Sequence, residues 1–278
     1  MAIMGIDPVL SGVPETALWT LFHRTSEARH PRTVLPDPVG VALADRLDFP
    51  FAARFGRGFP HQAQTIALRS RCFDDEIRAF LADRPDATVV ALGEGLETTF
   101  WRVDNGRVRW LSVDLPDSAA LRTRLLPAED RVRVHAGSAL DGSWMDEVDP
   151  AHGVIITAQG LLMYLPPADA EALIVACAER FPGAWFVFDA VTPLVDRQLV
   201  VSAGGSSGYR PPPLRWFVAA RDLPRLRTLS PAIRGVREVR SRSGRGVAGW
   251  VAARLRFVPV LGRQRPMVVR LTFGGDGR

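Results

Sequence analysis

The sequence contains no lysine, so all 35 of its basic residues are arginines. A bias this complete is more typical of a genome-wide coding preference than of a local binding surface. The net charge is +5 and the pI is near 10.3, but no recognised nucleic-acid module accompanies the arginines that are dense from Arg221 to Arg256. We expect these arginines to be solvated or ion-paired. Attraction of acidic small molecules is the first alternative, and binding of nucleic acid is the less favoured one.

Cysteine is scarce, and other signatures of reactive sites are missing. Cys72 and Cys177 lie in apparently helical segments without CxxC spacing, which predicts free buried thiols in a reducing cytoplasm. The five histidines are scattered and none pairs with another four residues on, so no metal site is predicted. G-x-S-x-G occurs once, at Gly204 to Gly208, but Ser202 to Pro213 is rich in glycine, serine and proline and is expected to be a loop rather than the strand, turn and helix of a nucleophile elbow.

Long apolar runs are also absent. No stretch approaches the ~20 apolar residues that a membrane span needs, and Met1 to Glu15 lacks the basic and apolar regions of a secretory signal. We therefore expect a cytoplasmic protein without a membrane partner. With 278 residues and 47% hydrophobic content, the chain can form one sizeable core with an additional lobe.

The most informative stretch runs from Thr88 to Arg102, TVVALGEGLETTFWR. A β-branched and apolar run breaks at Gly93 and Gly95 before a segment of helical length, which predicts a strand, a glycine turn and a helix. The next predicted strand, Val108 to Val113, ends at Asp114. Because ligands bind outside the carboxyl ends of parallel strands, the two glycines and Asp114 should meet at one crevice, where a carboxylate suits a ribose diol.

The residues of the turn separate two nucleoside cofactors. A dinucleotide fold uses G-x-G-x-x-G, but Thr98 stands where its third glycine would be. Glu94 and Glu97 would also repel a pyrophosphate. S-adenosylmethionine carries a sulfonium cation and no phosphate, so the turn favours this cofactor over NAD.

These motifs resemble the leucine carboxyl methyltransferase family, specifically its bacterial branch of polyketide-type O-methyltransferases. The resemblance covers most of the chain up to about Pro193. It rests on the order and spacing of several motifs: ETAL from Glu15, LPDP from Leu35, RSRCFDDEIRAFL from Arg69, LGEGLETTFWR from Leu92, VDLP from Val113, AQGLLMYL from Ala158 and FPGAWFVFDA from Phe181.

The resemblance implies a class I S-adenosylmethionine methyltransferase with an α/β, Rossmann-like sheet that is mostly parallel and has an antiparallel C-terminal strand. Residues 1–60 would form a helical cover, and residues 61–278 the core with the substrate pocket. The expected reaction transfers a methyl group to a carboxyl or hydroxyl of a small acidic or phenolic molecule and leaves S-adenosylhomocysteine. A non-catalytic cofactor-binding regulator and an RNA methyltransferase are the alternatives, and the sequence does not predict an oligomeric state.

The same resemblance assigns the cofactor site. Arg69 would bind the carboxylate of the methionine part, since a guanidinium can donate two parallel hydrogen bonds. Ser138 and Ala139 stand where the family often has Asp and an apolar residue beside adenine, and Gln159 stands where relatives acting on leucine carboxyl groups have Glu. The expected cofactor-binding residues are Arg69, Gly93, Gly95, Asp114, Leu115, Ser138, Ala139 and Gln159.

The catalytic candidates are His23, in the predicted cover, and Tyr164, which is as consistent with a buried phenol as with one facing the substrate. An ionised carboxylate can attack a methyl group unaided, whereas a phenol with a pKa of ~10 must lose its proton. No histidine falls in the segments expected at the crevice. The sequence therefore weakly favours a carboxyl acceptor aligned by arginine, with His23 as the base if the acceptor is a hydroxyl.

Other elements follow from periodicity and from turn residues. Phe49 to Pro60 is expected to be a loop, and Trp216 either a wall of the acceptor pocket or a core residue. The remaining expected helices are Pro14 to Arg29, Asp37 to Arg46, Gln62 to Arg84, Leu115 to Leu125 and Asp169 to Arg180, and the remaining strands are Val132 to Ala136, Gly153 to Ala158, Ala184 to Asp189, Val236 to Arg240, Val247 to Phe257 and Met267 to Phe273.

Overall fold

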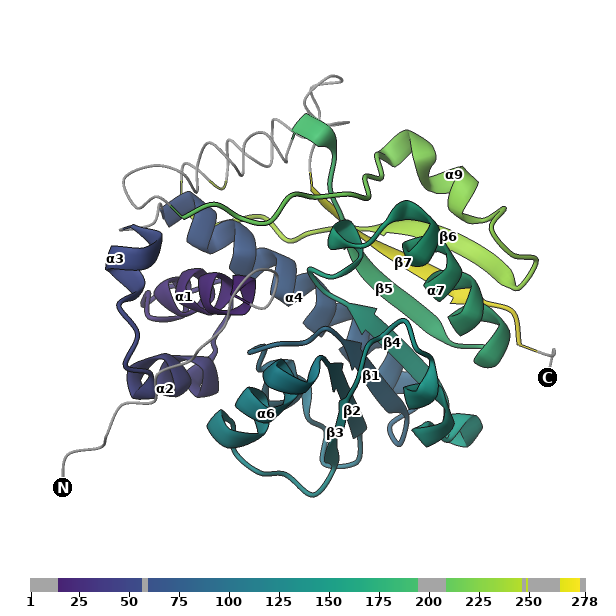
Figure 1. Cartoon of the computed structure of the whole chain (residues 1–278), viewed down its shortest axis with the longest axis horizontal. Coiled ribbons are helices and arrows are strands. Elements are labelled where there is room, and N and C mark those ends of the chain that lie inside the picture. Colours follow the sequence, from purple (N-terminus) through teal and green to yellow (C-terminus); the bar gives the residue numbers. More distant parts are fainter. Residues whose placement is uncertain (1–14, 57–59, 195–208, 247–248, 250–265, 276–278) are drawn as a thin grey trace.

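The computed structural model describes residues 15–56, 60–194, 209–246, 249 and 266–275. Its centre is a seven-stranded sheet in the order β3-β2-β1-β4-β5-β7-β6, with helices on both faces (Figure 1). All neighbours pair in parallel except β5 with β7 and β6 with β7. β7 therefore runs against the other six strands, as the sequence predicted for the C-terminal end.

The elements follow the predicted alternation of strands and helices. The strands are β1 (Thr88–Leu92), β2 (Arg109–Asp114), β3 (Val132–Ala136), β4 (Val154–Ala158), β5 (Trp185–Ala190), β6 (Ile233–Val239) and β7 (Met267–Phe273). The helices are α1 (Thr16–Ala28), α2 (Pro38–Arg46), α3 (Phe51–Phe55), α4 (Pro60–Asp83), α5 (Thr99–Val103), α6 (Pro116–Leu125), α7 (Pro167–Arg180) and α9 (Leu223–Leu226), with short 3₁₀ turns that include η3 (Leu162–Tyr164).

The central strands are apolar along their whole length because helices cover both of their faces. Every residue of β1 and of β4 is buried. On one face α4 packs through the buried residues Phe73, Ile77 and Phe80. On the other face α7 contributes Leu173 and Ile174 among other buried residues. The core thus fixes the sheet, and the carboxyl ends of β1, β2, β4 and β5 come to lie at one edge.

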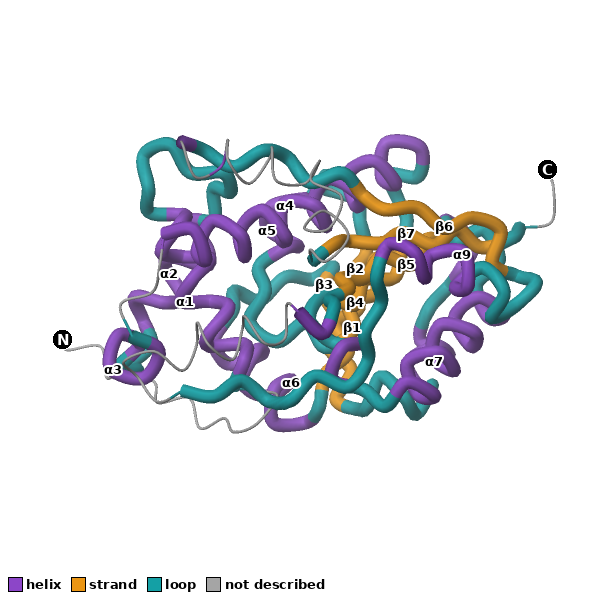
Figure 2. Tube along the Cα trace, turned by 90° about the horizontal axis from the view of Figure 1, so that it is seen from above, coloured by secondary structure: helices purple, strands orange, loops and turns teal. Residues whose placement is uncertain are grey.

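The N-terminal helices stand beside this edge, with α1 against α4 (Figure 2). The helix expected from Asp37 to Arg46 is α2: Asp37 caps it by accepting a hydrogen bond from the Gly40 amide at 3.0 Å, and Pro38 occupies its first turn. The expectation that Phe49 to Pro60 is a loop was wrong, since Phe51–Phe55 forms α3. Phe51 and Phe55 both contact Phe22 of α1, so tertiary aromatic packing stabilises a helix that the local sequence does not indicate.

At the other end of the chain β6 and β7 close the sheet. The strand expected at Val247 to Phe257 lies outside the described residues, apart from Gly249, and so do residues 202–208 of the glycine- and serine-rich stretch that is expected to be a loop. Trp216 is a core residue that packs on Phe188. None of the described helices is long and apolar enough to cross a membrane.

Candidate functional site

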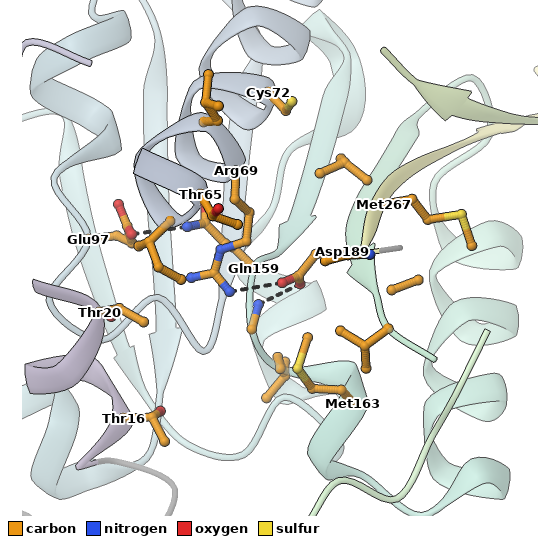
Figure 3. Close-up of a pocket in the computed structure, with 18 of the residues that line it drawn as sticks. Thr16, Thr20, Thr65, Arg69, Cys72, Glu97, Gln159, Met163, Asp189 and Met267 are labelled. Atoms are coloured by element: carbon orange, nitrogen blue, oxygen red, sulfur yellow. Dashed lines mark hydrogen bonds and ion pairs between the residues drawn. The ribbon is translucent and has the colours of Figure 1, made fainter. Parts of the chain in front are cut away.

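A cavity of about 500 Å³ opens at the carboxyl edge of the sheet. This volume lies within the ~300–1,000 Å³ that is typical of small-molecule pockets. Its lining comes from α1, α4, the turn after β1, the end of β2, the loop after β4, the end of β5 and the β6 and β7 edge. Figure 3 shows residues of α1 and α4 facing residues of the sheet edge across this cavity.

The turn after β1 presents bare backbone to the cavity. Gly93 has φ +60° and Gly95 has φ +52°, a conformation that L side chains rarely adopt. A Cβ on Gly95 would stand 2.9 Å from the Ala17 Cβ of α1, and one on Gly93 would stand 3.0 Å from Leu161 Cδ1. Conformation and space therefore both require glycine here, as the sequence pattern indicated.

Asp114 closes the turn from the end of β2. Its Oδ2 accepts a hydrogen bond from the Gly95 amide at 2.7 Å, and its Oδ1 accepts one from the Leu115 amide at 2.9 Å. Burial raises the pKa of Asp114, although these backbone hydrogen bonds act in the opposite direction. Within the described part of the chain no arginine lies within ion-pair distance of this carboxylate, which leaves lone pairs available for hydroxyl donors.

Arg69 reaches from α4 to the floor of the cavity (Figure 3). Its Nη1 donates to Asp189 Oδ2 at 2.9 Å, and Asp189 Oδ1 accepts from the Gly160 amide at 2.6 Å. The Nε of Arg69 is buried without a hydrogen-bond partner. A buried hydrogen-bond donor without a partner destabilises the fold. The guanidinium of Arg69 is therefore suited to an anionic ligand in the cavity.

Glu97 is a hub of hydrogen bonds beneath the turn. Its Oε1 accepts from Arg24 Nη1 at 2.7 Å and from Gln159 Nε2 at 3.0 Å. Ser70 Oγ also donates to Oε1, at 3.2 Å, and Arg102 Nη2 lies 3.4 Å from Oε2. Burial alone would raise the pKa of Glu97, but the charges of Arg24 and Arg102 outweigh it and hold the pKa below its usual value. Glu97 therefore stays ionised and orients Gln159.

Arg24 ties the N-terminal helices to this hub. Its side chain is 0% exposed, and its Nε donates to Asp37 Oδ2 at 2.7 Å. Its Nη2 donates to the Leu96 carbonyl oxygen at 3.0 Å. Burial opposes ionisation of Asp37, but Arg24 and Arg102 lower the pKa of this carboxyl to about 2. A buried ionic network thus joins α1 to the turn after β1.

Glu94, the other acid of the turn, has a structural role. Its Oε2 accepts from Trp110 Nε1 at 3.1 Å and lies 3.0 Å from Arg122 Nη2. Burial raises its pKa, and Arg122 acts in the opposite direction. Neither acid of the turn is therefore a free anion, because each is held by arginine.

The structure brings together most of the residues that the sequence assigned to the site. The assigned residues that line the cavity are Arg69, Gly93, Gly95, Asp114, Leu115, Gln159 and Tyr164. Ser138 and Ala139 are not among the lining residues. Ser138 instead accepts a hydrogen bond from the Leu140 amide, and Ala139 packs against the core. Their assignment to adenine binding remains a prediction.

His23 does not line the cavity. It is 1% exposed and packs against Trp19 and Phe22. Burial lowers its pKa to about 4, and its Nε2 has no hydrogen-bond partner. His23 therefore faces the aromatic side chains of α1 and not the cavity.

Two residues of the site were not singled out from the sequence as ligand-facing. Asp189 ends the apolar run WFVFD, and a carboxylate at the carboxyl end of a parallel strand is the same signal that identified Asp114. Glu97 was noted only as an acid of the turn. Its function as the hub depends on Arg24, 73 positions earlier in the chain, which no local pattern indicates.

The far side of the cavity is apolar. Its lining there includes side chains from the loop after β4, the end of β5 and the start of β7: Met163, Val191, Met267 and Val268. One cavity therefore combines a polar end, built on the glycine turn, with an apolar wall.

The comparisons with known proteins agree with this arrangement. Residues 17–178 match the leucine carboxyl methyltransferase family. The chain is 32% identical over 285 residues to the tetracenomycin polyketide synthesis O-methyltransferase TcmP of Streptomyces glaucescens, covering 97% of this chain and 100% of that protein. It is 26% identical over 187 residues to the S-adenosyl-L-methionine-dependent methyltransferase dpfgK of Gibberella zeae, covering 62% of each chain.

Among solved structures, the S-adenosylmethionine-dependent methyltransferase SibL superposes with a TM-score of 0.50 at 16% identity, covering 95% of this chain and 70% of that one. This likeness supports the fold alone. The family match and the relatedness to TcmP, together with the glycine turn, Asp114 and Arg69 in one cavity, lead to one conclusion: the chain belongs to the leucine carboxyl methyltransferase family and is an S-adenosylmethionine-dependent methyltransferase.

Proposed function

We propose that the protein is an O-methyltransferase that acts on a carboxyl or hydroxyl group of a small, polyketide-like molecule. The observation that carries the proposal is a cavity of about 500 Å³ in which the residues of the glycine turn face an apolar wall. The polar end fits the cofactor, and the apolar wall fits an aromatic or fused-ring acceptor. The full-length relatedness to a polyketide O-methyltransferase supports the same class of acceptor.

In this proposal each residue of the polar end has one task. Arg69 binds the carboxylate of the methionine part through its unpartnered Nε and its remaining N–H groups. Asp114 accepts hydrogen bonds from the ribose hydroxyls, and Gly93 and Gly95 let the ligand lie against the backbone. Gln159, fixed by Glu97 and Ser70, forms the wall behind the sulfur.

The cofactor supplies a methyl group on a cationic sulfur that is already a good leaving group. The protein then has to bind the acceptor, align its oxygen and exclude water. Met163, Val191 and Val268 provide an apolar surface for this purpose. No histidine lies among the described residues that line the cavity. We therefore favour a carboxylate acceptor, which needs no base, and Tyr164 is the hydroxyl that would contact it.

The test is turnover with a panel of paired acceptors. Purified protein is incubated with S-adenosylmethionine carrying a labelled methyl group and with aromatic acids, the matching phenols and the matching carboxamides. Label should enter the acids, and mild alkali should release it, because esters hydrolyse and aryl ethers do not.

Label that withstands alkali would assign a hydroxyl acceptor. Binding of S-adenosylhomocysteine without turnover on any acid or phenol would contradict the proposed activity. The Asp117→Asn variant serves as a control for expression and handling. Asp117 lies on α6, three residues after Asp114, and does not line the cavity.

A further inference from the structure

Three arginines line the cavity, and they differ in their partners. Arg69 is paired with Asp189, and Arg242 is paired with Asp75 through its Nε at 2.8 Å. Arg240, just after β6, has no carboxylate within ion-pair distance among the described residues. Among the arginines that line the cavity in the described chain, it is thus the one that is not paired with a carboxylate.

The register of the sheet places Arg240 away from the cofactor end. Val239 pairs with Val268 of β7, and Val268 pairs with Asp189 of β5. Adjacent strands lie ~4.8 Å apart, so Val239 lies two strands, or roughly 10 Å, from Asp189. Arg240 is the next residue after Val239. Because β6 is parallel to β5, both residues belong to the same edge.

Apolar side chains separate the two ends. Met267 and Val268 of β7 line the cavity between Asp189 and Arg240. Cys72 and Leu68 of α4 line it as well. A ligand that extends from the cofactor end to Arg240 must therefore pack an apolar part against these side chains and place an anionic group next to the guanidinium of Arg240.

We propose that Arg240 binds an anionic group of the methyl acceptor, so that the cavity selects flat apolar molecules with a carboxylate over their neutral analogues. The inference rests on the proposed function, because it takes the apolar half of the cavity to be the acceptor site. A guanidinium suits a carboxylate since its planar fork can donate two parallel hydrogen bonds. Its distance from Arg69 keeps this anion site separate from the one for the methionine carboxylate.

The test uses the protein saturated with S-adenosylhomocysteine and two probes, 2-naphthoate and 2-naphthamide, which share a ring system and differ in charge. Calorimetry gives the dissociation constant of each probe. In the wild type the carboxylate should bind about fivefold more tightly than the amide, near the upper end for an exposed ion pair. Arg240→Gln should abolish this preference and leave the affinity for the amide unchanged.

Arg234→Gln is the matched control, because Arg234 lies on β6, is exposed and does not line the cavity. It should retain the preference for the carboxylate. A wild type without that preference, an Arg240→Gln variant that keeps it, or an Arg234→Gln variant that also loses it would overturn the inference.

The cofactor titration separates this inference from the proposed function. Wild-type protein that fails to bind S-adenosylhomocysteine would refute the methyltransferase site itself. Wild-type protein that binds it but treats the two naphthalene probes alike would refute only the role of Arg240. Loss of S-adenosylhomocysteine binding in Arg240→Gln would place Arg240 in the cofactor site instead.

Discussion

Replacing Gln159 with Glu should make the stability of the protein strongly dependent on pH. In the structure Gln159 Nε2 donates to Glu97 Oε1 and to Ser70 Oγ, both at 3.0 Å. A carboxylate at this position would face the ionised Glu97 with no proton between the two groups. Gln159 is only partly buried, so the full interior penalty does not apply.

The loss of stability caused by Gln159→Glu has an upper limit. Two unit charges about 3 Å apart repel by roughly 5 kcal/mol at an effective dielectric constant of ~20. The new carboxyl group can escape this repulsion by binding a proton, which costs about 3.7 kcal/mol at pH 7 for a group whose unfolded pKa is ~4.3. The loss of stability at pH 7 is therefore at most about 4 kcal/mol, and at pH 5 it is at most about 1 kcal/mol by the same arithmetic.

The sign follows from proton binding. In the folded Gln159→Glu variant the pKa of the introduced carboxyl group is raised above its unfolded value, so the folded state binds more protons in the window between the two. The stability of the variant relative to wild type then falls as the pH rises through this window, and the loss is complete above the folded pKa. Urea unfolding of both proteins at pH 5, 6 and 7 measures the difference directly, and subtraction of the wild-type curve removes the titration of groups that the new carboxyl group does not contact.

Gln159→Met is the comparison variant, because it removes the two donated hydrogen bonds without adding charge. Its loss of stability should be the same at all three pH values. A Gln159→Glu variant whose loss relative to wild type stays constant from pH 5 to 7 would refute the contact with Glu97 as described.

Three further predictions concern the other residues of the site. Asp114→Asn should weaken S-adenosylhomocysteine binding at least about tenfold, since hydrogen bonds to a charged group contribute ~1.5–3 kcal/mol. Calorimetry measures the dissociation constant, and Asp117→Asn is the control. An unchanged affinity would remove Asp114 from the site. Arg69→Gln should weaken the binding of S-adenosylhomocysteine more than that of 5′-methylthioadenosine, which lacks the carboxylate. The control Arg71→Gln, which loses only the pair with Asp75, should change the affinity for neither ligand. Equal weakening of both ligands by Arg69→Gln would indicate a structural arginine. His23 has a folded pKa of about 4 against ~6.5 unfolded, so it favours the folded state fully above pH 6.5 and loses this contribution as the pH falls toward 4. His23→Phe should therefore remove about 2 kcal/mol of the acid sensitivity between pH 7 and 4.5 in urea unfolding and leave the pH profile of turnover from about 6 to 9 flat; a rate that collapses in this variant while the fold is retained would restore His23 as the base.

The sequence by itself determined the glycine turn and the position of Asp114 at the end of the next strand. The run TVVAL is followed by two glycines at the positions where the backbone has positive φ, and a following strand ends at Asp114. These signals are local, because strand formation, glycine turns and the carboxyl edge of a parallel sheet depend on residues close together in the chain. The order of the elements then sufficed to predict that the turn and Asp114 meet.

Tertiary structure decided which polar groups face the ligand. The apolar positions of α1 predicted a helix, but packing of this helix on α4 turned His23 into an aromatic cluster and buried Arg24 beneath the turn. From the sequence, Glu97 is an unpaired acid of the turn. In the structure it is paired with Arg24 and Arg102. Which side of a helix is buried, and which charge is paired with a distant partner, depend on contacts between segments 73 residues apart for Arg24 and Glu97 and 120 residues apart for Arg69 and Asp189. A pattern confined to one segment carries no information about such pairs, because their energy arises only when folding removes both groups from water together.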